Sequence, residues 1–387
     1  MFKKILALVL AFTLVFSLAA CTGNKETGKP SEKIVPSDKK VAILVAPEAQ
    51  YPEDYAAAMS IQAQYPDNVI VKEYSDSRIL QAGDGPIITL SEELAKDETV
   101  GAIVYARATE FTNYAISKAK AANPDIVTIA IEPEDKLSAV AHAANLVLTC
   151  DWEAAANDAV KTAASMGAKY FVFFSFERHT RNELVDSQRS AFKAACEGAG
   201  IEFVYTNCVD PTNAEGISKA QLVIREQVAQ LELNKKIMGS DVVLFSTDSA
   251  VQSTLVELAK AKGMIYLSGN FPSVYSGISE VFDVAAVENY YDTEAYIKNI
   301  GTAVKADAEN KARFASYNFN LMATLVFGAV YSAFDILNAT TTADNLAEKV
   351  ILRLTDAADS KSFTAKAYSD TLTNVFCAYN ADAFTVI

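Results

Sequence analysis

The sequence lacks most of the patterns that mark catalytic and metal sites. It has two histidines, His142 and His179, in 387 residues, and no H-E-x-x-H, G-x-S-x-G, Walker A or G-x-G-x-x-G pattern. His179 follows Ser175 by four residues, but no glycines of a strained nucleophile turn flank that serine. We therefore expect a protein that is not an enzyme and that carries no cofactor.

Cysteines are also few. Besides Cys21 the chain has four cysteines: Cys150, Cys196, Cys208 and Cys377. They form no C-x-x-C pair, and no cysteine and histidine stand at metal-ligand spacing, which argues against a zinc site. Cys196 lies near a predicted helix end and Cys208 ends the next strand, roughly 23 Å away at ~3.3 Å per residue. A disulfide cannot span that distance. We expect small buried hydrophobic residues or partly exposed thiols.

Positive charge is scarce. The chain has 34 Lys and Arg against 48 Asp and Glu, a net charge of −14. Nucleic-acid binding depends on clustered basic side chains that neutralise phosphates, so we expect no nucleic-acid partner. The length and the 51 % hydrophobic content permit two domains with full cores.

The N-terminal segment has the layout of a bacterial export signal. Met1-Phe2-Lys3-Lys4 carries positive charge, and residues 5–18 form an apolar run too short and too early for a stable membrane span. Leu18-Ala19-Ala20-Cys21 resembles the lipobox of bacterial lipoproteins, which implies cleavage before Cys21 and its acylation, with palmitate as one such chain. We expect a signal peptide over residues 1–20, a flexible tether over 21–39, and anchoring at the outer face of the bacterial cytoplasmic membrane.

From residue 41 onward, short apolar runs alternate with amphipathic stretches. Runs that are apolar on both faces, each followed by a helix, are typical of parallel sheets covered on both sides. One series has predicted strands at residues 41–46, 69–74, 102–105, 126–131 and 146–149. A second series has the same order of elements, with strands at residues 170–174, 201–208, 242–245 and 264–267. The pattern predicts an α/β fold of two Rossmann-like lobes with a ligand cleft between them.

The domain boundaries follow from these series. We expect an N-terminal lobe of residues 40–150 plus roughly 289–338, and a C-terminal lobe of residues 151–288. Crossings between the lobes are expected near Cys150 and near residues 281–288. Residues 339–387 form an extension that we assign to neither lobe, although 350–354 and 374–379 have the character of a helix and a strand.

Polar and aromatic side chains follow many of the predicted strands. Ligands in open parallel sheets bind beyond the carboxyl ends of the strands, so the candidate ligand-binding residues are Tyr51, Tyr105, Arg107, Glu132, Phe176, Arg178, His179, Asp248, Asn270 and Phe271. Helix capping is an alternative role for Asp248, and we favour it for Asn182. The arginines and the histidine suggest an anionic ligand, whereas the carboxylates suggest a cationic or hydroxyl-rich one, and both alternatives stay open.

Two stretches carry a resemblance to a known class of proteins. Residues 151–200, with Gly167, Arg189, Phe192, Ala195 and Gly200, are similar to the stretch of type 1 periplasmic-binding proteins where the chain enters its second lobe. Thr247-Asp248-Ser249-Ala250 resembles the segment that presents a ligand-contacting Asp there, although the sugar-binding branch has Asn where Thr247 stands. Ser175-Phe176-Glu177-Arg178-His179 resembles the S-F-x-R-H element of bacterial lipoproteins and secreted proteins classed as a domain of unknown function.

The resemblance implies a solute-binding lipoprotein. It would be a monomer that captures a small polar metabolite and passes it to the permease of an ABC-type importer, or signals its presence to a receptor. The alternative is an extracytoplasmic sensor or surface-interaction protein of similar fold.

Overall fold

The computed structural model describes residues 32–48, 51–74, 85–211, 216–235, 239–269, 271–275, 277–287, 292–358, 360 and 362–387. Residues 34–387 form one compact unit. The expected signal peptide and Cys21 lie outside the described residues, so the prediction of lipidation at Cys21 stays a prediction. Within the described part of the chain, no helix is long and apolar enough to cross a membrane.

The first sheet has seven strands among the described residues, all parallel except at one edge. Its order is β11-β12-β5-β4-β3-β1-β2, with bounds Phe363–Ala367, Val375–Asn380, Leu146–Cys150, Val127–Ile131, Val100–Tyr105, Lys40–Val45 and Val69–Glu73. Only β11 runs antiparallel to its neighbour in this sheet. The central strands are buried on both faces, which explains their continuous apolar runs.

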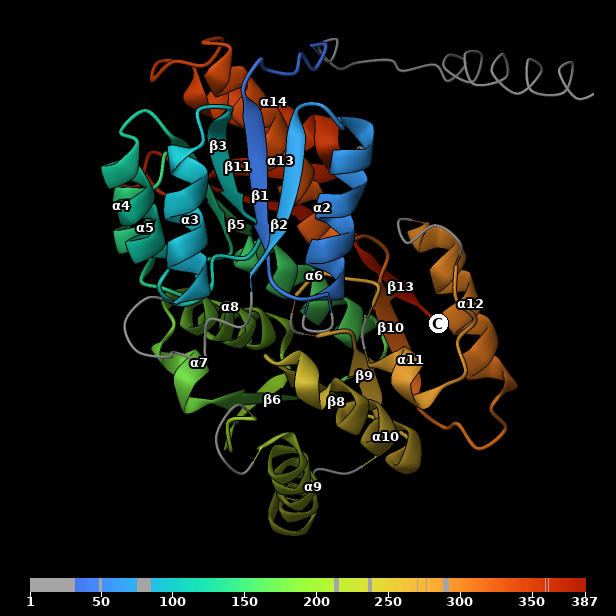
Figure 1. The fold of residues 1–387 in the computed structure, drawn as a ribbon. Helices are drawn as coiled ribbons and strands as arrows, with labels where there is room; N and C mark the ends of the chain where they lie inside the picture. The colour runs from blue at the N-terminus through green and yellow to red at the C-terminus, as the bar shows by residue number, and fades with distance from the viewer. Residues whose placement is uncertain are drawn as a thin grey trace, which may run out of the picture. The chain divides into compact units, whose positions relative to one another are not determined.

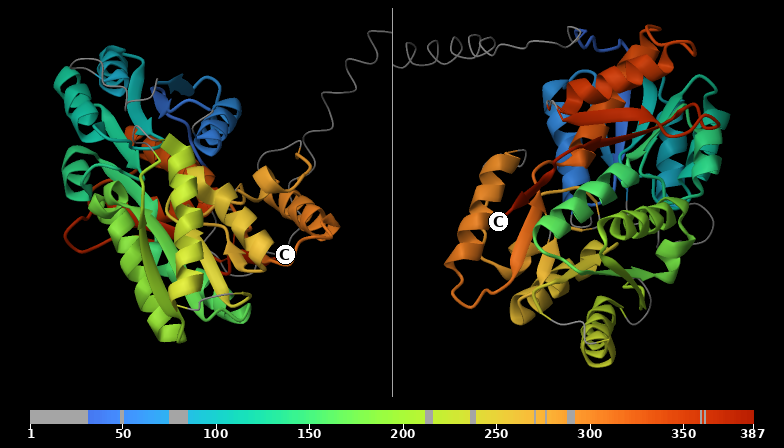
Figure 2. Two further views of the ribbon diagram at one scale, coloured as in Figure 1. Left: turned by 90° about the horizontal axis from the view of Figure 1, so that it is seen from below. Right: turned by 180° about the vertical axis from the view of Figure 1, so that it is seen from behind.

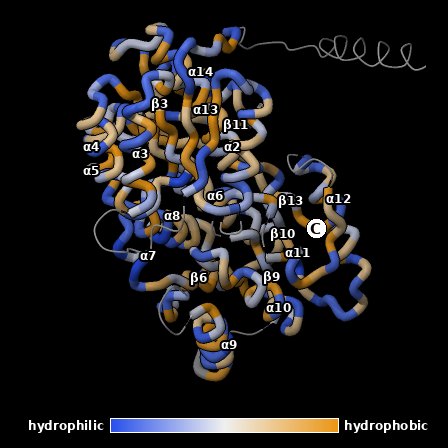
Figure 3. Tube along the Cα trace, in the orientation of Figure 1, coloured by the Kyte–Doolittle hydropathy of each residue, from blue (hydrophilic) through white to orange (hydrophobic). Residues whose placement is uncertain are grey.

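Helices cover both faces of this sheet (Figure 1). One face packs against α2 (Pro52–Gln64), α13 (Leu321–Leu337) and α14 (Leu346–Ala358). The other packs against α3 (Pro86–Lys96), α4 (Thr112–Ala122) and α5 (Leu137–Ala143). Because α13 packs on the sheet and is flanked by α2 and α14, it is apolar almost all round, as the hydropathy colours of Figure 3 show.

The second sheet has six strands within the described ranges. Its order is β13-β10-β9-β8-β6-β7, with bounds Phe384–Val386, Arg313–Tyr317, Ile265–Leu267, Val242–Ser246, Tyr170–Phe176 and Glu202–Cys208. On one face pack α6 (Trp152–Ser165) and α8 (Glu183–Ala199), which enclose a cluster of aromatic rings. On the other pack α9 (Gly216–Lys235), α10 (Gln252–Lys262), α11 (Ile278–Val281) and α12 (Thr293–Ala306). The prediction of two mainly parallel α/β lobes is confirmed.

The chain passes between the sheets three times within the described residues, and the views of Figure 2 let this path be followed by colour. The first passage, at Cys150, lies where the sequence predicts it. The second lies between Tyr317 and Leu321, later than the expected 281–288. The third joins β12 to β13.

The expected first-lobe segment 289–338 is therefore divided between the sheets. Tyr296, Ile300 and Val304 recur every four residues on α12 and bury their side chains in the second core. The strand that follows, β10, pairs in parallel with β9 of the second sheet, whereas α13 packs on the first. The previously unassigned residues 339–387 contain the helix and the strand expected there, α14 and β12, and two further strands, β11 and β13.

All four cysteines of the described residues are free and buried. Burial raises the thiol pKa of Cys196, Cys208 and Cys377 to about 12. The expectation that no disulfide links Cys196 to Cys208 is confirmed.

Candidate functional site

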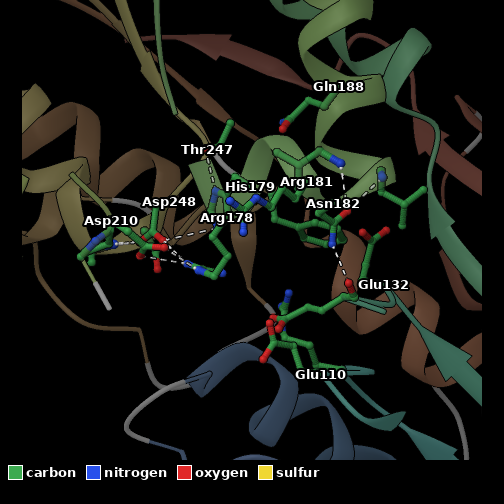
Figure 4. A pocket seen from close by; sticks show the side chains of 18 of the residues that line it. Glu110, Glu132, Arg178, His179, Arg181, Asn182, Gln188, Asp210, Thr247 and Asp248 are labelled. Atoms are coloured by element: carbon green, nitrogen blue, oxygen red, sulfur yellow. Dashed lines mark hydrogen bonds and ion pairs between the residues drawn. The ribbon is translucent and has the colours of Figure 1, made fainter. Parts of the chain in front are cut away.

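A cavity of about 1130 Å³ lies between the carboxyl ends of strands from both sheets. The first sheet contributes residues that follow β3 and β4, including Arg107, Glu110 and Glu132. The second sheet contributes Arg178 and Asp248. Figure 4 shows Arg178, Asp210 and Asp248 together, with Glu110 and Glu132 apart from them. A volume of this size accommodates a small molecule.

Arg107 reaches the cavity from the loop after β3 and is held by a carboxylate. Its Nε and Nη2 donate to the two oxygens of Asp54 at 2.7 and 3.0 Å, a bidentate pair in which Asp54 is almost fully buried. Burial alone lowers the pKa of Arg107, but the charge and hydrogen bonds of Asp54, together with the charges of Tyr51 and Glu132, outweigh it and the net shift is upward. Burial raises the pKa of Asp54 and Arg107 opposes that shift. The bidentate geometry favours the ionised form of both groups.

Aromatic rings surround the Arg107 guanidinium. Its central carbon lies 4.5 Å from the ring centroid of Tyr51 and 5.7 Å from that of Phe271. Trp152, at the start of α6, meets Phe271 edge to face at 6.0 Å. All three rings line the cavity, and the Trp152 indole nitrogen is buried without a hydrogen-bond partner in the described part of the chain. These rings give the cavity an apolar wall suited to a flat or hydrocarbon group.

Glu132 follows β4 with an unusual backbone. Its φ is +49°, in the left-handed region that residues other than glycine rarely adopt. One carboxylate oxygen, Oε1, accepts hydrogen bonds from the Thr149 hydroxyl at 2.8 Å and from the Cys150 backbone N–H. Burial nevertheless raises the pKa of Glu132 to about 7, with Arg107 acting in the opposite direction.

The second wall contains another paired arginine. Arg178 lies on the one-turn helix α7 (Glu177–Arg181), and its Nε donates to Asp210 at 2.8 Å. Its Nη2 is 3.7 Å from Oδ2 of Asp248. Burial lowers the pKa of Arg178, but the hydrogen bond and charge of Asp210, together with the charges of Asp248 and Glu134, outweigh it and the pKa is raised. Asp248 also caps the turn Ser249–Val251 by accepting from the Ala250 N–H at 2.9 Å, and it lines the cavity.

His179 is neutral in this setting. Burial, reinforced by the Arg178 charge, lowers its pKa to about 4. Its Nδ1 lies 2.8 Å from the Thr247 hydroxyl, which in turn lies 3.0 Å from the hydroxyl of Ser175. Ser175 is 1 % exposed and is therefore closed off from the cavity. The two residues considered as half of a catalytic pair are linked through Thr247 and not directly.

Hydrogen bonds join the lobes beside the cavity. Asn182 caps α8 through Oδ1, as expected, and its Nδ2 donates to the Glu134 carbonyl of the first lobe at 3.0 Å. On the other side, the Ser273 hydroxyl donates to Glu53 of α2. Burial raises the pKa of Glu53 to about 8, although the bond from Ser273 opposes this shift.

The structure brings seven of the ten predicted ligand-binding residues to this cavity: Tyr51, Arg107, Glu132, Arg178, His179, Asp248 and Phe271. Tyr105 does not line it, because its ring is buried under α3 with the hydroxyl 3.1 Å from Ser91. Phe176 does not line it either. It belongs to β6, which is longer than predicted, and its buried ring lies against His179 at 5.2 Å. Asn270 lies outside the described residues.

The sequence reasoning missed several residues that matter here. Asp210 follows β7 by two residues, so the rule that selected Arg107 after β3 would also have found it. The sequence does not single out Asp54 as a site residue. It lies in the first turn of α2, where acidic residues are common because they complement the helix dipole. Trp152 was assigned only to the start of a helix.

Comparison with known proteins identifies the family. Residues 39–315 match the family described as "Protein of unknown function (DUF3798)". This chain belongs to that family. An uncharacterized protein from Treponema pallidum (strain Nichols) is 28 % identical to the DUF3798 chain over 173 residues, which cover 44 % of this chain and 79 % of the relative.

Solved structures with the same fold have low sequence identity. A putative transcriptional regulator from Clostridium difficile 630 superposes with a TM-score of 0.72 at 17 % identity, covering 91 % of this chain and all of that one. An ABC transporter solute binding protein from Clostridium phytofermentas with bound L-rhamnose has a TM-score of 0.54 at 11 % identity, covering 91 % of this chain and 96 % of that one. At these identities the likeness concerns the fold, and it confirms the expected type 1 periplasmic-binding-protein-like architecture of the DUF3798 chain.

Proposed function

We propose that this protein is an extracytoplasmic solute-binding lipoprotein. It captures a small polar metabolite in the cavity between its two sheets and delivers it to an ABC-type importer. Acylated Cys21 anchors it at the outer face of the cytoplasmic membrane. The observation that carries the proposal is the cavity itself, because charged side chains from the strand ends of both lobes face one space.

The proposed mechanism is capture by closure of the lobes. A ligand that touches residues of both walls, such as Glu132 on one and Asp248 on the other, stabilises the arrangement in which the walls are close. Chain segments that pass between lobes are the usual places where such a movement is absorbed. Three such passages join the lobes in the described chain.

The fold supports this proposal without selecting a solute. The Clostridium phytofermentas protein of the same fold is a solute binding protein that holds L-rhamnose. Sugar specificity does not follow for this chain, which is 11 % identical to it.

The test of solute binding is native mass spectrometry of freshly purified Cys21→Ser protein lacking residues 1–20, followed by a thermal-shift screen of metabolites. A co-purified small molecule, or stabilisation by about 2.7 kcal/mol at a hundredfold excess over the Kd, is expected. Arg178→Ala should change the affinity for the compound found, whereas Lys193→Gln on the exposed side of α8 should leave it unchanged. A screen without any binder contradicts solute capture and favours the sensor or surface-interaction role.

The anchoring half of the proposal needs its own measurement. The full chain should incorporate radiolabelled palmitate in bacterial cells and sediment with membranes, and Cys21→Ser should do neither. Equal labelling of both proteins would refute acylation at Cys21.

A further inference from the structure

The charge of the cavity bears on the choice between an anionic and a cationic ligand. Arg107 and Arg178, which suggested an anionic ligand, each form an ion pair with a carboxylate of the protein. Asp54 forms a bidentate pair with Arg107, and Asp210 accepts from Arg178 with Asp248 nearby. His179 adds no positive charge at neutral pH, because its pKa lies near 4. The positive groups are therefore neutralised within the protein.

Carboxylates remain in excess around the cavity. Among the described residues, six carboxylate side chains line it against three guanidinium groups. The third guanidinium, Arg181, pairs with Glu177 on the exposed face of α7. An anionic ligand would have to approach this surplus of negative charge in a partly desolvated space, where charges interact more strongly than in water.

Glu132 lines the cavity, and only one of its two carboxylate oxygens has hydrogen-bond partners among the described residues. Its Oε1 takes both of its hydrogen bonds, and Oε2 has neither a hydrogen bond nor an ion-pair partner within the described part of the chain. Its backbone also adopts a positive φ of 49°, a conformation that costs free energy and is common at binding sites. Oε2 of Glu132 is therefore available to accept a hydrogen bond from a donor group of the ligand.

We propose that the ligand of this cavity carries a positively charged nitrogen that donates a hydrogen bond to Oε2 of Glu132, while Tyr51, Trp152 and Phe271 pack against its uncharged part. This inference rests on the proposed solute-binding function and narrows its ligand class to organic cations. The surplus carboxylates supply the surrounding negative field, and the aromatic rings add a surface that also attracts cations. The neutral hydroxyl-rich alternative leaves the excess charge of the cavity unbalanced.

The test compares compounds that share a skeleton and differ in charge. A thermal-shift panel of matched ammonium, hydroxyl and carboxylate compounds, such as tyramine, tyrosol and 4-hydroxyphenylacetate, is extended with agmatine, putrescine, L-rhamnose and citrate. We expect stabilisation by ammonium or guanidinium compounds and none by their carboxylate counterparts. Binding by only neutral or anionic compounds overturns the inference and leaves solute binding standing. Binding by no compound of any charge counts against the proposed function itself.

Substitution at Glu132 locates the interaction. Glu132→Gln keeps the shape and the Oε1 acceptor, and we expect the Kd of the best cationic probe to rise roughly 10- to 100-fold, the loss typical of a hydrogen bond to a charged group. Glu197→Gln is the matched control, since Glu197 does not line the cavity and is exposed and paired with Lys193 on α8, and its effect should be under about twofold. An equal Kd in wild type and Glu132→Gln would overturn the assignment.

Calorimetry of the unmodified protein gives a readout that does not depend on how the variant folds. At pH 7, Glu132 is partly protonated, and a bound cation favours its ionised form. Binding of the cationic probe should release a proton, so the measured heat should differ between phosphate and Tris buffers. A heat that is independent of the buffer would contradict contact between the cation and Glu132.

Discussion

Replacing Asp54 by asparagine should destabilise the protein strongly, because it leaves the buried guanidinium of Arg107 without its charge partner. The Arg107 side chain is 18 % exposed and that of Asp54 2 %, so solvent screens the pair only weakly. Two unit charges about 4 Å apart attract by about 4 kcal/mol at an effective dielectric constant near 20. Breaking a buried pair by removing one partner typically costs about 3–5 kcal/mol. Because the asparagine side chain would retain one acceptor oxygen, we expect a loss of about 3 kcal/mol.

The assay is urea denaturation of four proteins: wild type, Asp54→Asn, Arg107→Gln and the double variant. The double variant removes both charges and should be more stable than the sum of the two single losses implies, by about 2 kcal/mol or more. Lys193→Gln, which breaks an exposed pair with Glu197, is the control and should change the free energy of unfolding by less than about 0.5 kcal/mol. Additive single losses, or a loss below about 1 kcal/mol in Asp54→Asn, would refute the view that Arg107 is neutralised within the protein.

Three further predictions follow from the described contacts. Burial raises the pKa of Glu53 from 4.5 to about 8, so the folded state retains a proton that the unfolded chain loses. The free energy of unfolding should therefore fall as the pH rises through this interval, and denaturation of Glu53→Gln at several pH values should show a shallower fall. Asn182→Ala should cost about 1–2 kcal/mol in chemical denaturation, more than Asp292→Ala, because Asn182 caps α8 and also bonds to the other lobe, whereas Asp292 only caps α12. Equal losses of stability in the two variants would show that the hydrogen bond from Asn182 to the other lobe contributes nothing measurable. Gly277→Ala should destabilise the protein by about 1–3 kcal/mol, because a Cβ there would lie 2.5 Å from the backbone nitrogen of Ser253. Gly198→Ala should stabilise it by about 0.5–1 kcal/mol, because Gly198 lies in α8 with open space where a Cβ would stand. Calorimetric Tm values of the two variants that shift in the same direction would contradict this.

The architecture was predictable from the sequence because strands and helices are each recognised by a local pattern of apolar residues. Buried runs such as 100–105 and 170–176 are apolar on both faces, and the amphipathic stretch after each run identifies a covering helix. The passage near residue 318 was placed too early because β10 is a short strand of five residues whose sequence has only a weak apolar pattern. Its assignment depends on pairing with β9, a contact between residues distant in the sequence.

The location of the site was predictable, but the partners of its residues were not. Position after a strand selected Arg107, Arg178 and Asp248 correctly for the cavity. Their charge state depends on which carboxylates fold against them, and Asp54 comes from a different element, 53 residues earlier in the chain than Arg107. The anionic interpretation of the arginines failed to anticipate that pairing. Phe176 was misjudged for a related reason, since a strand two residues longer than expected carried its ring into the core.

The position of β12 has a consequence for how the protein is made. This strand lies between β11 and β5 in the first sheet, and its partner β5 is translated before the whole second lobe. Until β12 emerges from the ribosome, β5 presents an unpaired edge of backbone donors and acceptors, the kind of surface on which other strands add and aggregation begins. Contacts between such distant segments also slow folding. The lobe synthesised first is therefore completed only after all of the second sheet except β13 has been made, and a nascent chain needs protection at that edge during this time.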